Sequence, residues 1–198
     1  MKNIVKTGCL ALFLCFASYQ SANAQFGKLF DKAKKTVTKA TKAVDNASTV
    51  ANAGEVIKLE GGGTMTYTFK DRVNFELVGV YGKSTSENYG DVYVVLKVKM
   101  LTNKSELPIG GPVNMGEIVP TAIDQDGNVY KTESPGWYEY TVSEGLFVKL
   151  NLSDRILFKN VKKSVKTLQQ LKLTYSLSYA DKGILTLSDV PVQWGVEP

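Results

Sequence analysis

Hydrophobic and polar residues alternate with a period of two along much of the chain after residue 60. In the longest such stretch, residues 91–103, every even position from Val92 to Met100 is apolar. Charged residues such as Lys97 and Lys99 stand among the odd positions. Successive side chains of a β-strand point to opposite faces of a sheet, so this stretch predicts a long strand that is buried on one face.

Shorter alternating runs on both sides of this stretch predict further strands. Two of them have regular apolar faces, formed by Leu171, Leu173, Tyr175, Leu177 and Tyr179, and by Leu146, Val148, Leu150 and Leu152. The apolar parity of a third run, residues 185–194, reverses near Asp189, which predicts a β-bulge there. Asp126-Gly127-Asn128 has the residues of a hairpin turn. Seven to nine short strands with turns between them predict an all-β fold, an antiparallel β-sandwich.

The first 24 residues have the pattern of an export signal. Lys2 and Lys6 precede an apolar stretch, residues 9–17, that is too short to span a bilayer. The small residues Ala22-Asn23-Ala24 predict cleavage before Gln25. Both cysteines of the chain lie in this signal, so the mature protein offers no disulfide. We therefore expect an exported protein that is periplasmic or extracellular.

Residues 25–54 predict a basic, amphipathic α-helix that precedes the sandwich. Its apolar residues recur in steps of three and four, at Phe26, Phe30, Ala33, Val37, Ala40, Val44, Ala47 and Ala51. This segment holds six lysines against two aspartates, whereas residues 55–198 hold 16 basic residues against 17 acidic ones. Since the basic excess belongs to this arm and the sandwich is nearly neutral, we expect no nucleic-acid partner.

Three interpretations of the arm stay open. It is a solvated N-terminal extension, a self-associating helix, or a helix on an anionic membrane surface. In the membrane interpretation, three apolar residues insert and lysines lie over the headgroups: Phe26, Leu29, Phe30, Lys28, Lys32 and Lys35. Residues 55–63 contain a short strand candidate, residues 56–59, and a glycine run that we expect to be a flexible linker. The sandwich then covers residues 64–198.

Two stretches carry a resemblance to a known family. Residues 90–105 form a long alternating strand that ends in Leu-Thr-Asn-Lys-Ser, and residues 122–130 form an aspartate and glycine hairpin before Tyr130. This pattern resembles a broad family of exported, immunoglobulin-like bacterial domains of unknown function, of the Bacteroidetes-type secreted proteins. The resemblance covers about residues 64–195. It implies an immunoglobulin-like sandwich and brings no catalytic residues with it.

The chain lacks most side chains that common catalytic and metal sites require. Histidine is absent and the mature chain has no cysteine, which excludes Ser-His triads, thiol nucleophiles and ordinary zinc sites. Residues 82–85, Gly-Lys-Ser-Thr, lack the earlier glycine of a phosphate-binding loop. In residues 124–128, Asp-Gln-Asp-Gly-Asn, the glycine stands fourth, where a helical calcium loop requires it sixth. We therefore expect neither an enzyme nor a bound metal or cofactor.

Aromatic residues form the best candidate for a recognition surface. Four lie close together in the sequence and two precede or begin the long strand, namely Tyr130, Trp137, Tyr138 and Tyr140, and Tyr89 and Tyr93. Flat side chains with a polar tip suit the apolar face of a sugar ring or a protein partner. The alternative is that Trp137 or Tyr138 fills one end of the sandwich.

These observations favour a non-catalytic, exported interaction or accessory module that its basic arm holds at the envelope surface, peripherally at the outer membrane. Its partner is a protein or a glycan, and its oligomeric state stays open. The alternative function is a carbohydrate-binding domain that uses the aromatic loop around Trp137. A glycosidase is the least favoured hypothesis, since Glu133 and Glu139 are the only acidic pair beside the aromatic residues.

Overall fold

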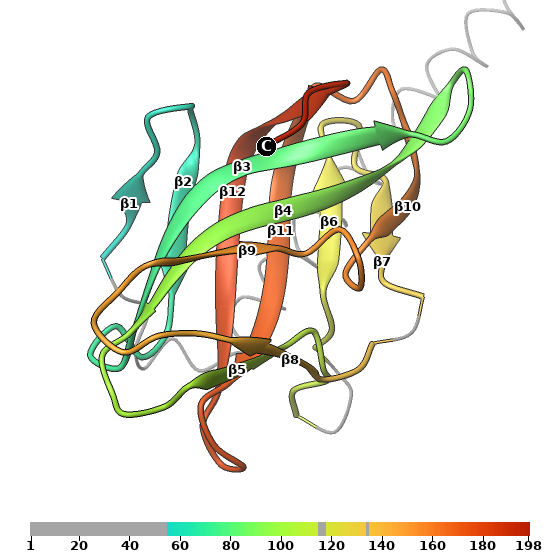
Figure 1. Ribbon diagram of the computed structural model, residues 1–198. Coiled ribbons are helices and arrows are strands. Elements are labelled where there is room, and N and C mark those ends of the chain that lie inside the picture. Colours follow the sequence, from blue (N-terminus) through green and yellow to red (C-terminus); the bar gives the residue numbers. More distant parts are fainter. Residues whose placement is uncertain (1–54, 115–117, 134) are drawn as a thin grey trace, which may run out of the picture. The chain divides into compact units, whose positions relative to one another are not determined.

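Twelve β-strands make up the regular structure of residues 55–198 in the computed structural model, which describes these residues except 115–117 and 134 (Figure 1). The strands are β1 (Ile57–Lys58), β2 (Thr64–Tyr67), β3 (Val73–Ser84), β4 (Tyr89–Met100), β5 (Glu106–Ile109), β6 (Thr121–Asp124), β7 (Val129–Lys131), β8 (Tyr138–Thr141), β9 (Val148–Asn151), β10 (Phe158–Lys162), β11 (Thr167–Ser176) and β12 (Lys182–Trp194). No helix occurs among the described residues. The all-β prediction is confirmed, but twelve strands form where seven to nine were expected. The signal and the predicted helix, residues 1–54, lie outside the described residues.

The strands form a sandwich-like fold of two layers. In the first layer the central pair is β11 and β12, which are antiparallel from Thr167↔Pro191 to Ser176↔Lys182. Strand β2 pairs with β12, and β1 with β2. On the other side, β11 pairs with β6 near one end and with β5 near the other, and these strands pair with β7 and β8. In the second layer, β3 and β4 form a long hairpin, and β9 and β10 pair in succession with the outer edge of β4.

Strand β12 belongs to both layers. Asp189 has a positive φ of 54°, and beyond it residues 192–194 pair with Val80–Gly82 of β3 in parallel. The predicted reversal of the buried face at Asp189 is observed, since Leu187 and Val190 are both buried. The predicted bulge is not, because the register of β12 with β11 is continuous from Thr167↔Pro191 to Ser176↔Lys182. The purely antiparallel arrangement was wrong, because this pairing makes the sheet mixed. Strand β12 therefore pairs with strands of both layers and joins the two layers at this edge.

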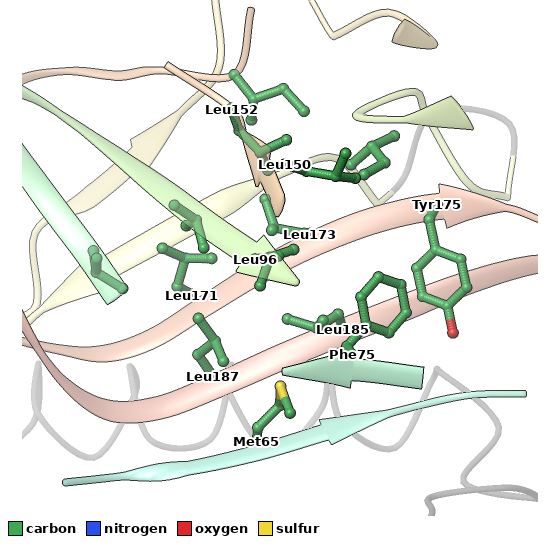
Figure 2. Close-up of a cluster of buried hydrophobic side chains, with 14 of the residues drawn as sticks. Met65, Phe75, Leu96, Leu150, Leu152, Leu171, Leu173, Tyr175, Leu185 and Leu187 are labelled. Atoms are coloured by element: carbon green, nitrogen blue, oxygen red, sulfur yellow. The ribbon is translucent and has the colours of Figure 1, made fainter. Parts of the chain in front are cut away.

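The main hydrophobic core lies between the layers, as Figure 2 shows for leucines of β4 and β9 facing those of β11 and β12. The inner face of β4 is fully buried, in agreement with the alternation of the sequence. Its members are Val92, Val94, Leu96, Val98 and Met100. Leu171, Leu173, Tyr175 and Leu177 are buried in the same way. Two predicted members of apolar faces are exposed instead, Leu146 at 70% and Tyr179 at 97%.

The glycine run at residues 61–63 is a hairpin turn, where a flexible linker was expected. Ile57 pairs with Met65, and the Leu59 N–H donates to the Gly63 carbonyl at 3.1 Å. Gly63 has a φ of 81°, and a Cβ there would lie 2.4 Å from the Ser188 carbonyl oxygen. The close approach of the β12 backbone therefore requires glycine at this position. Residues 57–67 form a β1–β2 hairpin that belongs to the first layer.

Trp194 fills the gap between the layers at one end. Its indole lies against two glycines of the β3–β4 hairpin, where a Cβ would be 2.2 Å from the ring at Gly82 and 2.6 Å at Gly90. Its Nε1 donates to the Val165 carbonyl at 2.7 Å. Trp194 thus packs against the main core, as does Tyr138, one of the two residues for which the sequence left a filling role open.

Candidate functional site

Tyr130 is committed to a structural hydrogen-bond network at the β6–β7 turn. Its hydroxyl donates to Oδ2 of Asp124 at 2.8 Å, and the Asn128 side-chain amide donates to the same oxygen at 2.8 Å. The backbone N–H groups of Asp126 and Asn128 donate to Oδ1, each at 2.9 Å. The predicted hairpin turn is confirmed by the pairing of Ile123 with Val129. Tyr130 therefore stabilises this turn and is not part of a free recognition surface.

The Asp124 side chain is fully buried, yet it is held as a carboxylate. Burial alone would raise its pKa, but the hydrogen bonds from Asn128, Tyr130 and the turn backbone together lower the pKa below the usual value. A depressed pKa in the folded state adds stability above the unfolded-state pKa of about 3.9, and this stability is lost as the pH falls through the folded-state value.

We expect Asp124→Asn to lower the free energy of unfolding by about 1–3 kcal/mol at pH 7, because the new amide opposes the Asn128 donor and removes a charged acceptor. The deficit should shrink below about pH 4 as Asp124 of the wild type becomes protonated. Urea unfolding at several pH values measures both effects, with Asp126→Asn in the same turn as an exposed control. Wild-type stability of Asp124→Asn at pH 7 would contradict this account of the turn.

Tyr138 and Tyr140 lie two residues apart on β8 and pack on the main core. Both side chains are partly buried, whereas Glu139 between them is exposed. The Arg155 guanidinium lies 5.6 Å from the centre of the Tyr138 ring. Burial raises the pKa of Tyr140, and the negative charge of Asp154 adds to the rise. The period-two alternation of a strand thus directs these two rings inward.

Trp137, directly before β8, has a different environment. Its ring lies against Gly111, where a Cβ would be 2.1 Å from Cδ2 of the indole. The Lys182 ammonium lies 5.8 Å from the centre of this ring. The same ammonium lies 5.8 Å from the ring centre of Tyr179, which is 97% exposed. We call Trp137, Tyr179 and Lys182 the aromatic surface.

The turn that carries Tyr179 is tightly held although its tip is exposed. Asp181 pairs with the Arg72 guanidinium at 3.0 Å and accepts a hydrogen bond from the Ser178 hydroxyl at 2.8 Å. The Leu177 N–H donates to the Asp181 carbonyl at 2.8 Å, and the Lys104 ammonium donates to the Leu177 carbonyl. The Arg72 hydrogen bond, together with that from Ser178, lowers the pKa of Asp181. The exposed ring therefore stands on a fixed backbone.

Tyr89 and Tyr93 do not join this surface. Tyr93 is buried on the outer face of β4 and stacks on Tyr81, with ring centres 5.9 Å apart. Tyr89 is 42% exposed and pairs with Lys162 of β10. Figure 1 places the β3–β4 turn, beside which both lie, at the opposite end of the sandwich from the β11–β12 turn. The predicted six-residue site thus separates into several environments, and only Trp137 remains a candidate for the aromatic surface.

Sequence reasoning missed Tyr179 and Lys182. Tyr179 continues the alternation of β11 by two residues, so it was assigned to the buried face, although the strand ends at Ser176. The polar run Asp181-Lys182-Gly183 directly after it was the available signal that the chain turns at this point. Lys182 gave no separate signal, because its position beside both rings depends on the distant segment before β8.

The remaining predicted positions add no chemistry to this site. The Glu133 carboxylate pairs with the Lys159 ammonium at 2.7 Å, and both side chains are exposed. Within the described part of the chain, no cluster of three or more acidic, histidine or cysteine side chains could hold a metal ion. The described residues also include no helix that could span a membrane. The six residues proposed for membrane contact, from Phe26 to Lys35, lie outside them.

Comparisons of the chain with protein-family models, with curated proteins and with solved structures found no match. The function is therefore inferred from the arrangement of the side chains. Two rings and a cation on a rigid support form a contact surface that suits a ligand with both apolar and polar faces.

Proposed function

We propose that this chain is an exported, non-catalytic interaction module, an immunoglobulin-like β-sandwich that its basic arm holds at the envelope surface. The observation that carries the proposal is the aromatic surface. Tyr179 is almost fully exposed on a turn fixed by Arg72 and Asp181, and it shares Lys182 with Trp137. A soluble sandwich gains little from an aromatic ring in water, whereas a binding partner gains a large contact area.

The rigid backbone beneath these rings supports a role in binding. Tyrosine and tryptophan have few side-chain torsions, so they lose little entropy when a partner covers them. Trp137 loses still less, because its ring already lies against Gly111. Lys182 adds a positive charge that attracts carbonyl, carboxylate or hydroxyl oxygens of the partner. The surface therefore fits a protein segment or a glycan.

The arm supplies the second part of the proposal. We expect the intact protein to sediment with cell envelopes at low salt and to be released by about 0.5–1 M NaCl, because exposed lysines bind anionic headgroups through screened charges. Deletion of residues 25–53 should move the protein to the soluble fraction. Fractionation of cells that express either form measures this, and replacement of Lys28, Lys32 and Lys35 by glutamine separates charge from the apolar contacts. Salt-independent retention, or retention of the deleted form, would refute the arm's role.

A carbohydrate-binding domain is the second candidate, and the pairing of Trp137 with Tyr179 favours it. Aromatic rings present an apolar face to sugar C–H groups, and Lys182 between them can donate to ring hydroxyls. This function predicts glycan binding that survives deletion of residues 25–53 and is lost in Trp137→Ala. The envelope-surface proposal predicts instead that the deletion abolishes membrane retention.

A further inference from the structure

A cavity of about 670 Å³ opens beside the outer face of the second layer. Three segments line it: residues 82–93 of the β3–β4 hairpin, residues 151–157 between β9 and β10, and residues 195–198 after β12. The Gly195 N–H donates to the Gly82 carbonyl at 3.2 Å, which fixes the last segment to the hairpin. Cavities of roughly 300–1,000 Å³ are typical of small-molecule sites. The cavity shares no residue with the aromatic surface.

The apolar part of the cavity wall includes Tyr93 and Leu157, together with Val196 and Pro198 of the last segment. Tyr93 and Leu157 belong to a small hydrophobic cluster with Tyr81 and Val95, separate from the main core. Tyr93 and Tyr81 are stacked with an interplanar angle of 27°. Tyr81 in turn lies over Gly79, where a Cβ would be 2.8 Å from its ring. Tyr81, itself packed on Gly79, supports one face of the Tyr93 ring, so the cavity has a supported apolar patch.

Polar side chains line the rest of the cavity. Hydroxyl and amide groups come from Ser84, Thr85, Asn151 and Ser153. The Asn151 Oδ1 accepts the Ser153 N–H at 3.0 Å, which leaves the amide N–H groups of Asn151 directed as donors. Burial, helped by the charge of Glu197, raises the pKa of Tyr93, whose phenol is protonated at neutral pH in any case.

The charged groups of the lining restrict the ligand class. Asp91 and Glu197 supply two carboxylates against the single ammonium of Lys83. The resulting net negative charge disfavours phosphates and carboxylates. Carboxylate acceptors beside amide and hydroxyl donors match a neutral ligand whose own hydroxyls both donate and accept. An apolar patch beside them matches the C–H face of a sugar ring.

We propose that this cavity is a binding site for a neutral sugar of one or two rings, with Tyr93 and Leu157 against the ring face and Asn151 and Asp91 on its hydroxyls. The site goes beyond the proposed function, because it is separate from the aromatic surface and independent of the arm. It also assigns a role to Tyr93, which the sequence grouped with Trp137 and the structure places elsewhere.

The test is a titration of the ¹⁵N-labelled full chain with glucose, galactose, mannose, N-acetylglucosamine, maltose and lactose, each to about 20 mM, followed by amide chemical shifts. At least one sugar should shift amides of residues 82–93 and 151–157 with a Kd of millimolar or below. Glucose 6-phosphate should bind more weakly than glucose. No shift in these segments with any sugar of the panel would overturn the proposal.

Variants separate this site from the aromatic surface. Ser153→Trp fills the cavity, and Asn151→Ala removes donors from an exposed position; each should weaken binding about tenfold or more, a loss of about 1.4 kcal/mol. The spectra of both variants show whether the fold is kept, and Asn151→Ala decides the matter if the larger substitution unfolds the chain. Tyr179→Ala should leave the sugar affinity unchanged. Binding that persists in Asn151→Ala, or that is lost in Tyr179→Ala, would contradict the assignment.

Discussion

Replacement of Trp194 by alanine is expected to lower the free energy of unfolding by about 3–5 kcal/mol, the range measured for truncation of large aromatic core residues. The indole fills the space over Gly82 and Gly90 and donates to the Val165 carbonyl at 2.7 Å. Its loss leaves a cavity and an acceptor without its donor. It also removes the side chain that packs where β12 joins the second layer. The layers should therefore separate more easily at this edge.

Urea unfolding of Trp194→Ala measures this loss, and Gln193→Ala on the same strand is the exposed control. Gly82→Ala tests the same contact from the other side. Its Cβ would meet the indole at 2.2 Å, so we expect a loss of about 1–3 kcal/mol from overpacking. Gly61→Ala, where a Cβ would have nothing within 4 Å, should leave stability near that of the wild type. A loss below about 1 kcal/mol in Trp194→Ala would show that Trp194 does not hold the layers together.

Tyr179→Ala is expected to separate binding from stability. Since the side chain is 97% exposed, the free energy of unfolding should change by no more than about 0.5 kcal/mol. Affinity for the ligand should fall about 30-fold or more, because aromatic residues at the centre of an interface contribute at least about 2 kcal/mol. Trp137→Ala should cause a loss of similar size, with some cost in stability from its contact with Gly111.

The matched control is Leu146→Ala, another exposed apolar side chain, which lies outside the aromatic surface. It should change neither stability nor affinity. Lys182→Gln keeps a polar side chain, one bond shorter, and removes the charge, so it measures the share of the cation in binding. Equal losses of affinity in Leu146→Ala and Tyr179→Ala would mean that binding is non-specific hydrophobic adhesion.

The sequence was sufficient to predict elements whose pattern is local. The inner face of β4 is continuous from Val92 to Met100, and a strand with such a face can bury it in only one register. The reversal of the buried face at Asp189 was equally visible, because the apolar parity before and after this residue differs. Both predictions rest on the geometry of a single strand, which the residues of that strand determine.

Features that depend on distant contacts were not predictable in this way. The parallel pairing of β12 with β3 brings Val192 beside Val80, and no local pattern encodes that partnership. The turn at Tyr179 depends on the ion pair of Asp181 with Arg72, which is 109 residues away in the sequence. The alternation of β11 continues beyond its last residue, so the pattern alone placed Tyr179 inside.

The six aromatic residues of the predicted site are not all brought together, for a related reason. Tyr130, Trp137 and Tyr138 are neighbours in the sequence, and proximity suggested a common surface. Buried Asp124 instead binds the Tyr130 hydroxyl, and strand alternation directs Tyr138 toward the core. Trp137 is only partly buried, with its ring packed on the backbone of Gly111. Sequence proximity of aromatic residues is therefore a weaker guide than the strand and turn positions they occupy.

The most direct test of whether the aromatic surface binds the partner compares wild type and Tyr179→Ala on an array of glycans and on isolated cell envelopes, in about 1 M NaCl so that the arm holds neither protein. Both proteins are applied at equal concentration after their stability has been shown to be equal. We expect wild type to bind at least one of these targets, Tyr179→Ala to lose this binding, and Leu146→Ala to retain it. Identical binding by wild type and Tyr179→Ala would contradict the account.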